Sequence, residues 1–387
     1  MVPNGWMRSQ IGEIANVQVG RDLDEERYSD VPSDKFRYPV YSNTVEARGL
    51  YGFYDFPEYP GNAVTVVGRG IGLGTAFARK ENEPFGAIGR LLVLTPKNNS
   101  FDVGFLSDYI NFSLRIHNES GGIPQLPGAS LSRYFVTLPP LPEQKKIAKI
   151  LSTWDRAITT TEQLLANSQQ QKKALMQQLL TGKKRLLDTN EVRFSGEWKE
   201  VRLKSVLREV KTRNKDNSID RVLSVTNHSG FVLPEDQFSK RVASDDVSNY
   251  KVVKNGEYGY NPSRLNVGSF ARLDSYEEGL LSPMYVVFSV NEKLLNSDYF
   301  MNWMSSNEAK QRISGSTQGS VRDSVGFDSL CGFPFKLPPM EEQQKIAAVL
   351  STADQEISAL QQKLEALKQE KKALMQQLLT GKRRVLI

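Results

Sequence analysis

Hydrophobic residues recur at alternating steps of four and three along two stretches of the chain. In residues 337–387 the series is Ile346, Leu350, Ala353, Ile357, Leu360, Leu364, Leu367, Lys371, Leu374 and Leu378. In residues 138–190 it is Ile147, Leu151, Trp154, Ile158, Thr161, Leu165, Ser168, Lys172, Leu175 and Leu179. Such a narrow stripe is typical of a helix that faces a partner in a coiled coil. Each stretch is therefore predicted to form one long helix.

The two stretches are copies of one sequence, separated by 199 residues. Residues 138–185 and 337–384 are identical at 29 of 48 positions, and the run 172–183 recurs unchanged at 371–382. Paired prolines at 139–140 and 338–339 disfavour helix just upstream. A Thr-Gly-Lys sequence at 181–183 and 380–382 ends each copy with a glycine suited to a left-handed cap. The repeat thus has matching starts and stops.

The shared register favours pairing of the two helices with each other. The alternative is that each helix packs only on its own domain. Lys172 and Lys371 hold equivalent positions in the seam, and polar seam residues lower stability but can fix the register of a pair. Chain order leaves the relative direction open, and an antiparallel pair would place the preceding segments at opposite ends.

The two segments that precede the helices, residues 1–137 and 191–336, are similar in length but diverge in sequence. They share only a faint opening, in which Trp6 is matched by Trp198. Both are predicted to be mixed, with strands such as residues 61–67 and 282–288, and with amphipathic helices at 101–116 and 297–313. Similar helices that carry dissimilar heads suggest that the heads determine what is bound, whereas the helices provide a common scaffold that holds the heads.

Composition limits the class of protein. The chain has 387 residues and a net charge of +6, but the heads carry only −2 and +1, whereas the repeats carry +5 and +2. A uniformly basic surface for non-specific DNA binding is therefore not expected, and DNA reading by the heads would use local patches. The single cysteine, Cys331, excludes an internal disulfide and suits a reducing cytoplasm. We expect neither a membrane span nor a signal peptide.

Motifs for catalysis are not found in the sequence. The glycine-rich residues 68–74 lack the spacing of a phosphate-binding or dinucleotide-binding loop and are expected to be turns. Asn261-Pro262 is followed by Ser263 and Arg264, so it lacks the second proline and the aromatic residue of an adenine methyltransferase site. Two histidines and one cysteine make no metal cluster. We therefore expect no catalytic residues, no metal and no cofactor.

The order head–helix–head–helix resembles the specificity subunit of type I restriction-modification systems. The resemblance rests on Leu-Pro-Pro-Leu-Pro-Glu-Gln-Lys-Lys-Ile-Ala at 138–148, its counterpart at 337–347, and the Leu-Leu-Thr-Gly-Lys ending of each helix. Gly-Ile-Pro-Gln-Leu at 122–126 also fits a pattern common in that family. The resemblance covers the whole chain in organisation, but it is strong only in the helices.

The resemblance implies an α+β protein with two mixed target recognition domains, separated by two long helices that form an antiparallel coiled coil. The domains would be residues 1–137 and 191–336, with a central repeat helix at 138–190 and a C-terminal repeat helix at 337–387. Each head would read one half of a bipartite site in double-stranded DNA. Two methyltransferase subunits, and often restriction subunits, would be the partners that carry out catalysis, with adenine methylated by base flipping.

The residues that read bases are predicted from chemistry, since Arg, Lys, Asn and Gln side chains can reach base edges in the major groove while others hold phosphates. The candidates are Asn43, Arg48, Arg69, Arg79 and Arg90 in the first head, and Asn227, His228, Asn261, Arg264 and Arg272 in the second. Tyr51, Tyr54, Tyr258 and Tyr260 could donate to phosphates. Ordinary surface or core placement is the competing interpretation for each.

Two other functions remain open from the sequence. A stand-alone methyltransferase or nuclease would need a cofactor or metal motif. A coiled-coil scaffold whose heads bind proteins would explain the helices, but not two divergent heads on nearly identical helices.

Overall fold

The computed structural model describes residues 2–117, 122–234, 246–317 and 324–385. The chain folds into two compact units. Unit 1 comprises residues 1–163 and 361–387, and unit 2 comprises residues 164–360. Unit 1 is therefore built from the two ends of the chain, whereas unit 2 is one continuous segment.

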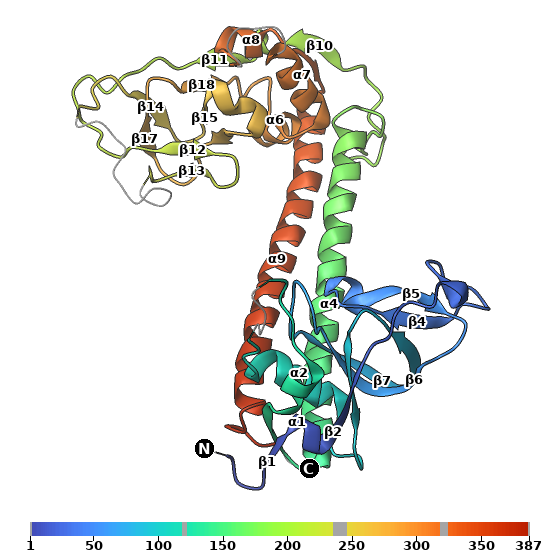
Figure 1. Cartoon of the computed structure of the whole chain (residues 1–387). Coiled ribbons are helices and arrows are strands. Elements are labelled where there is room, and N and C mark those ends of the chain that lie inside the picture. Colours follow the sequence, from blue (N-terminus) through green and yellow to red (C-terminus); the bar gives the residue numbers. More distant parts are fainter. Residues whose placement is uncertain (1, 118–121, 235–245, 318–323, 386–387) are drawn as a thin grey trace. The chain divides into compact units, whose positions relative to one another are not determined.

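Each predicted repeat helix is a single element of 39 residues, α4 (Leu141–Leu179) and α9 (Met340–Leu378) (Figure 1). The start of α4 packs with the end of α9 in unit 1, and the end of α4 packs with the start of α9 in unit 2. The pairs are Asp155–Lys371 at 2.5 Å and Glu162–Lys368 at 2.7 Å in unit 1, and Lys172–Asp354 at 2.5 Å and Ser168–Glu356 at 3.0 Å in unit 2. Residue numbers rise along one helix as they fall along the other, so the expected antiparallel pairing is confirmed.

A buried glutamate from the start of each helix binds an arginine that follows the end of the other helix. In unit 2, Glu342 is completely buried and accepts two hydrogen bonds from Arg185, at 2.6 and 2.7 Å. In unit 1, Glu143 and Arg384 form the equivalent forked pair, with both contacts at 2.7 Å. Such bidentate contacts fix geometry as well as charge. The hydrogen bonds to Glu342 raise the pKa of Arg185 above its ordinary value.

The glutamine next to each glutamate ties the helix to its head. The buried Gln144 accepts from the Asp102 N–H at 2.9 Å, and Gln343 accepts from the Asn296 N–H at 2.8 Å. Each glutamine also donates to a proline carbonyl of its own signature at 2.9 Å. Asp102 and Asn296 in turn cap a helix of the head. The Glu-Gln pair of the repeated signature, which we term the lock, therefore holds the start of each helix to the end of the other helix and to a head.

The first head contains a seven-stranded sheet in the order β2-β8-β6-β7-β4-β5-β3, in which only β4 and β7 run parallel. These strands are β2 (Ala15–Val19), β3 (Tyr28–Ser29), β4 (Tyr38–Tyr41), β5 (Leu50–Tyr54), β6 (Tyr59–Val66), β7 (Ala76–Ala87) and β8 (Leu92–Pro96). The head also contains β1 (Met7–Gln10), paired with β9 (Phe135–Leu138), the helices α1 (Ile11–Ile14), α2 (Val103–Ser113) and α3 (Gly128–Ser132), and the 3-10 helices η1 (Glu25–Arg27) and η2 (Glu46–Gly49). The predicted helix at 101–116 and strand at 61–67 are thus found as α2 and β6.

The second head has smaller sheets. A four-stranded sheet runs β11-β18-β15-β16, and three antiparallel pairs are β12–β13, β14–β17 and β10–β19. The strands are β10 (Lys199–Arg202), β11 (Leu207–Glu209), β12 (Ser224–Thr226), β13 (Gly230–Val232), β14 (Lys251–Lys254), β15 (Tyr258–Tyr260), β16 (Phe270–Arg272), β17 (Glu278–Leu281), β18 (Val286–Val290) and β19 (Pro334–Leu337). The strand predicted at 282–288 begins only at Val286, after a turn.

The helix predicted at 297–313 is in fact two helices, α6 (Ser297–Met304) and α7 (Asn307–Thr317). The chain turns at Ser305 and Ser306, and the Ser306 hydroxyl accepts from the Ala309 N–H at 3.3 Å. Serine is a favourable cap because its side chain satisfies a free N–H group at a helix start. A short helix, α8 (Phe327–Cys331), follows α7.

Each unit buries its core where the head meets the helix ends. In unit 1 the core includes Phe105 of α2, Ile147 and Leu151 of α4, and Leu378 and Leu379 at the end of α9. In unit 2 the corresponding core includes Trp303, Phe335, Leu179, Ile346 and Leu350. None of the helices in the described ranges has the length and apolarity that a bilayer crossing demands.

Candidate nucleic-acid interface

Asn43 joins two loops of the first head. Its side-chain oxygen accepts from the Gly68 N–H at 2.8 Å, and its side-chain nitrogen donates to the Gly89 carbonyl oxygen. These glycines precede Arg69 and Arg90, which are both exposed. Asn43 therefore brings two of the predicted arginines together, while its own amide is occupied by the backbone.

Arg69 lies in a loop that is paired with residues 122–126. The Leu126 N–H donates to the Gly68 carbonyl at 2.8 Å, and Arg69 forms an antiparallel bridge with Gln125. The predicted turns at 68–74 are confirmed by this geometry. Gln125 is not among the residues predicted from the sequence, although it belongs to the Gly-Ile-Pro-Gln-Leu pattern at 122–126.

Gly68 allows this close packing. A Cβ atom at Gly68 would lie 2.7 Å from the Arg90 carbonyl oxygen, which is closer than real Cβ contacts. Arg90 itself has a positive φ of 68°, which is uncommon for a residue other than glycine. The turn at Arg90 is therefore held against the Arg69 loop by backbone contacts, and the Arg90 side chain remains exposed.

Arg79 is buried, in contrast to the other arginines predicted in this head. Its Nε donates to Thr65 Oγ1 at 3.0 Å, and a terminal nitrogen donates to the Arg48 carbonyl at 2.7 Å. Its guanidinium lies 3.4 Å from the centre of the Tyr41 ring. Burial lowers the pKa of Arg79 to about 10. Arg79 thus positions the turn at Arg48, whose backbone has a positive φ of 56°. The side chain of Arg48 is exposed.

Three of the predicted residues of the second head line one depression of about 430 Å³, namely Asn227, Asn261 and Arg264. Asn261 accepts from the Ser263 N–H at 3.0 Å and thereby caps the 3-10 helix η4 (Pro262–Val267). Arg264 is exposed, and Asn227 is exposed on the turn between β12 and β13. The fold therefore collects donors and acceptors from two loops into one concave site.

The other two predicted residues of the second head do not line this depression. His228 is exposed on the same turn as Asn227. Arg272 forms ion pairs with Asp274 at 2.6 Å and with Asp298 at 2.7 Å. Burial acts to lower the pKa of Arg272, but hydrogen bonds to the two carboxylates raise it overall. Its positive charge is thus already balanced within the head.

The tyrosines suggested as phosphate donors are mostly in the core. Tyr54, Tyr258 and Tyr260 are buried, and burial raises the pKa of each hydroxyl. The Tyr258 hydroxyl lies 2.5 Å from Ser297 Oγ. Only Tyr51 is exposed among the four, so the suggestion fails sterically for the other three.

Unit 1 has a depression of about 630 Å³ beside α2, β7 and α4, and one of the carboxyl groups that line it, that of Asp108, is partly buried. It is lined by the cationic residues Arg48, Lys80, Lys145, Lys149 and Lys371, together with Asp102, Asp108 and Asp155. Burial raises the pKa of Asp108 to about 6, nearby Lys371 opposes this shift, and Asp155 adds to it.

We expect Asp108→Asn to stabilise unit 1 above pH 6. Since the folded-state pKa of Asp108 is above its ordinary value of 3.8, protonation stabilises the fold. That stabilisation is fully present below about pH 4 and is lost as the pH rises through about 6. The variant should therefore gain about 1 to 3 kcal/mol at pH 7 and almost nothing at pH 4. Urea unfolding from pH 4 to 8 measures this, with exposed Asp34→Asn as control. A pH-independent difference would contradict the assignment.

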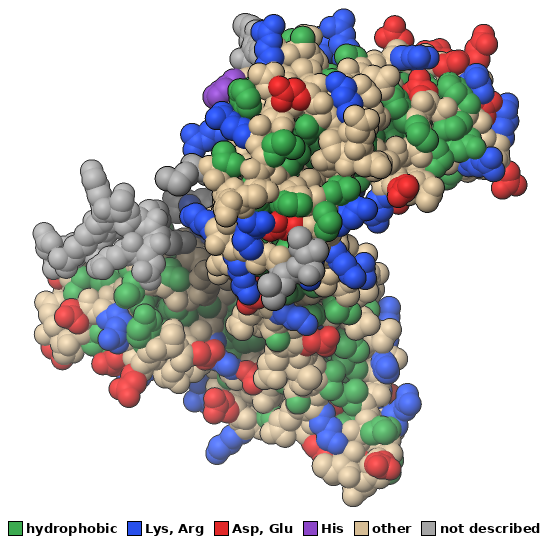
Figure 2. Space-filling view, turned by 90° about the horizontal axis from the view of Figure 1, so that it is seen from below, with side chains coloured by type: hydrophobic (Ala, Val, Ile, Leu, Met, Phe, Trp, Pro, Cys, Tyr) green, Lys and Arg blue, Asp and Glu red, His purple; other side chains and the backbone are tan. Residues whose placement is uncertain are grey.

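No cluster of metal-ligand side chains occurs among the described residues. Cys331 is buried, and burial raises the pKa of its thiol. Figure 2 shows Lys and Arg side chains interspersed with Asp and Glu over the face in view. What the two heads offer chemically is therefore hydrogen bonding and local positive charge on loops.

The sequence profile of the family described as the type I restriction modification DNA specificity domain matches residues 3–167 and 244–369. The MjaVIII type I restriction enzyme specificity subunit of Methanocaldococcus jannaschii is 25% identical over 99% of this chain and 94% of its own length. Two Mycoplasma pneumoniae proteins described as type I specificity subunits are 29% and 28% identical over 38% of this chain. The aligned regions span only 47% and 39% of those two relatives.

Solved structures show the same fold. The S subunit of a type I restriction-modification system from M. genitalium superposes with a TM-score of 0.64 at 13% identity, covering 98% of this chain and 99% of that one. A chain from a structural study of complex assembly and conformational transition in the type I R-M system gives a TM-score of 0.52 at 15% identity, covering 99% and 100%.

Proposed function

Because this chain belongs to the type I restriction modification DNA specificity family, we propose that it selects the DNA sequence on which a type I complex acts. The family match extends over parts of both heads, and this is the observation that carries the proposal. The ligand is double-stranded DNA with a bipartite recognition site, one half-site for each head. The first head uses Arg48, Arg69 and Arg90, and the second uses Asn227, Asn261 and Arg264, with His228 beside them.

The remaining predicted residues have supporting roles in this proposal. Asn43 and Arg79 hold the loops that carry the arginines of the first head. Arg272 is held by two carboxylates and contributes to the shape of the second head. Loops on a rigid scaffold commonly carry binding residues, because the scaffold fixes their geometry.

The chain itself is non-catalytic in this proposal, and two methyltransferase subunits bind to it and methylate adenine. Restriction subunits join the complex in systems that contain them. The antiparallel helix pair supports this role, since the two copies of the repeat offer equivalent surfaces in two units. The complex works in the cytoplasm, where chromosomal DNA is accessible.

The test is to map methylated adenines in cells with and without this chain, alongside purification of its cognate methyltransferase. The proposal expects one bipartite motif to lose methylation, and a complex of two methyltransferase subunits per specificity chain. Methylation by the isolated chain with S-adenosylmethionine would instead identify a stand-alone enzyme. Absence of sequence-dependent DNA binding by the assembled complex would favour a protein scaffold.

Replacing Arg264 by alanine tests the second head directly. We expect the complex to bind its target duplex about 1 to 3 kcal/mol more weakly, because an exposed arginine in a donor-lined depression can make a bidentate base contact. Preference should relax at one base position of one half-site. Competition binding against duplexes substituted at each position measures both effects. Arg208→Ala, an exposed arginine on β11, is the matched control. A uniform loss on all sequences would assign Arg264 to a phosphate.

A further inference from the structure

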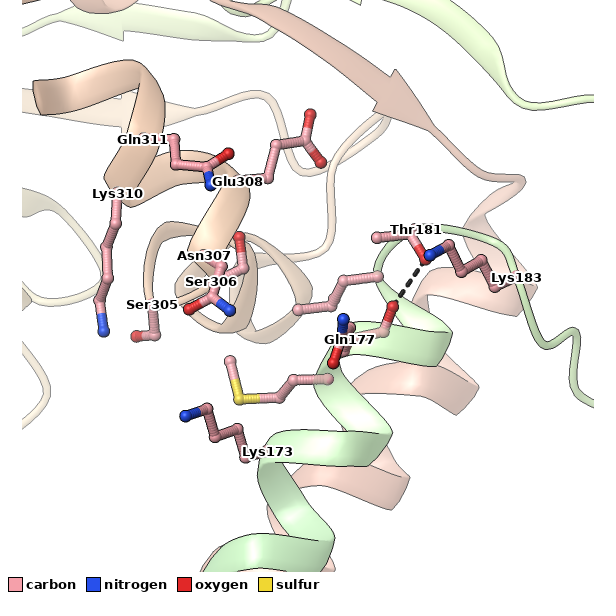
Figure 3. A pocket seen from close by; sticks show the side chains of 12 residues that line it. Lys173, Gln177, Thr181, Lys183, Ser305, Ser306, Asn307, Glu308, Lys310 and Gln311 are labelled. Atoms are coloured by element: carbon pink, nitrogen blue, oxygen red, sulfur yellow. Dashed lines mark hydrogen bonds between the residues drawn. The ribbon is translucent and has the colours of Figure 1, made fainter. Parts of the chain in front are cut away.

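Unit 2 has a depression of about 670 Å³ between the last turns of α4 and the corner where α6 meets α7 (Figure 3). Three lysines lie on its lining, Lys173 and Lys183 from the region of the α4 end and Lys310 from α7. All three side chains are exposed. The floor is partly apolar, with Met176 of α4 and Leu180, which directly follows that helix.

This depression adjoins the candidate reading site of the second head. A neighbouring depression of about 450 Å³ shares Ser305 and Lys310 with it. The 450 Å³ depression also shares Asn227 and Val267 with the 430 Å³ depression that Arg264 lines. We term these three adjoining depressions together the lysine groove; through their shared lining residues they link the end of α4 to the base-reading candidates.

The lysine groove offers positive charge that the fold does not neutralise. In the described parts of the chain, Lys173, Lys183 and Lys310 make no ion pair with a carboxylate. The one carboxylate on the lining of the 670 Å³ depression, Glu308, is bound by Arg312 at 2.7 Å. Figure 3 shows Gln177, Asn307 and Gln311 around the same space. These side chains, together with lysine, are the groups that proteins use to hold DNA phosphates.

The groove is a feature of the second head. In the first head, α2 occupies the position of α6, since both helices are capped by the residue that the buried glutamine of the signature binds. After α2 the described residues 114–117 form no helix, whereas α7 follows α6. The equivalents of Lys173 and Lys183, which are Lys372 and Lys382, therefore lack a facing element like α7 in the described residues.

We propose that the sugar-phosphate backbone beside the half-site of the second head lies along the lysine groove, with Lys173, Lys183 and Lys310 bound to phosphates. The inference rests on the proposed function and adds to it a flanking contact without sequence preference. Continuity with Asn227 and Arg264 and the uniform donor chemistry favour DNA over the acidic segment of a partner protein. The DNA contact of the second head thus extends beyond its base-reading loops, onto the repeat helix.

The test uses the complex assembled with its methyltransferase subunits. Lys173, Lys183 and Lys310 are replaced together by glutamine, and affinity for target and unrelated duplexes is measured across a range of salt concentrations. Each phosphate contact contributes a slope of about 0.9 to the dependence of log affinity on log salt, so the slope should fall by about 2 to 3. At about 0.1 M salt, affinity should fall by about 10- to 100-fold and by the same factor on both duplexes.

Two further variants test whether the effect comes from the charge of these lysines, and whether it depends on their position in the groove. Replacing the same three residues by arginine keeps the charge and should retain the salt dependence. Replacing Lys204, Lys293 and Lys336 by glutamine removes three exposed charges from the same unit, outside the groove, and should leave the slope nearly unchanged.

An unchanged salt slope in the groove variant overturns the inference. If the groove variant folds but no longer assembles with the methyltransferase, the groove binds a protein and the inference is wrong, while the proposed function stands. A wild-type complex that does not discriminate target from unrelated DNA would instead overturn the proposed function. An equal loss of slope in the control variant would reduce the groove to general surface charge and would also count against the inference.

Discussion

Glu342→Ala is expected to lower the free energy of unfolding of unit 2 by about 3 to 5 kcal/mol, because it leaves buried partners without their acceptor. Glu342 accepts two hydrogen bonds from Arg185 and a third, at 2.9 Å, from Trp198 Nε1. The arginine is only 18% exposed, so water can replace the lost carboxylate only in part. Hydrogen exchange of core amides, followed in each unit, should show loosening confined to unit 2.

Unit 1 supplies the matched comparison. Glu143→Ala removes the equivalent carboxylate, but its partner Arg384 is 42% exposed and can be hydrated. Trp6, the counterpart of Trp198, has no hydrogen-bond partner for its Nε1 among the described residues, so the first unit loses fewer contacts. The loss should therefore be smaller than that of Glu342→Ala. An equal or larger loss in unit 1 would show that burial does not govern the strength of this lock.

Exchange of the first head for that of a relative is expected to change one half of the methylated motif and to leave the other half and the gap unchanged. Residues 1–137 carry Arg48, Arg69 and Arg90, whereas Asn227 and Arg264 belong to the other unit. The incoming head must present a backbone N–H to Gln144, as Asp102 does here, because that bond ties the head to the helix. Genome-wide methylation mapping reads out both half-sites at once.

The reciprocal exchange of residues 191–336 is the control, and it should alter the other half-site alone. A change in both half-sites after either exchange would contradict independent reading by the two heads. If the exchanged chain fails to assemble with the methyltransferase, the cause would be a damaged contact between the new head and the helix. A variant that retains the native residues around Asp102 tests this explanation.

The repeat helices could be predicted from sequence because their signal is periodic and occurs twice. The seam of α4 and α9 follows directly from the steps of four and three, and two polar seam residues, Thr161 and Ser168, are buried. The direction of pairing needed contacts between positions distant in sequence, such as Asp155 with Lys371. A stripe of apolar residues is the same whichever way the partner runs, so periodicity alone does not determine it.

The candidate site was predicted less well, because residue type does not reveal burial. Arg69 is exposed on a loop and Arg264 is exposed on the 3-10 helix η4, but Arg79 is buried on a strand and binds Thr65 and a backbone carbonyl. Burial along β7 does not alternate, since Ala76 and Arg79 are buried and Phe77 and Ala78 between them are half-buried, so strand periodicity does not place Arg79 inside. The lysine groove was also missed, since it depends on the break between α6 and α7, which the helical pattern of residues 297–313 does not show.

The construction of unit 1 from both ends of the chain has a consequence for synthesis on the ribosome. Unit 2 is continuous and can fold as soon as residues 164–360 have emerged, since domains fold as units during translation. The first head emerges earlier, but its core lacks Leu378 and Leu379 until the end of α9 has been made. A chain whose translation stops early would thus carry a complete second unit and an incomplete first one. Both heads can therefore reach their folded form only after Leu378 and Leu379 have been made.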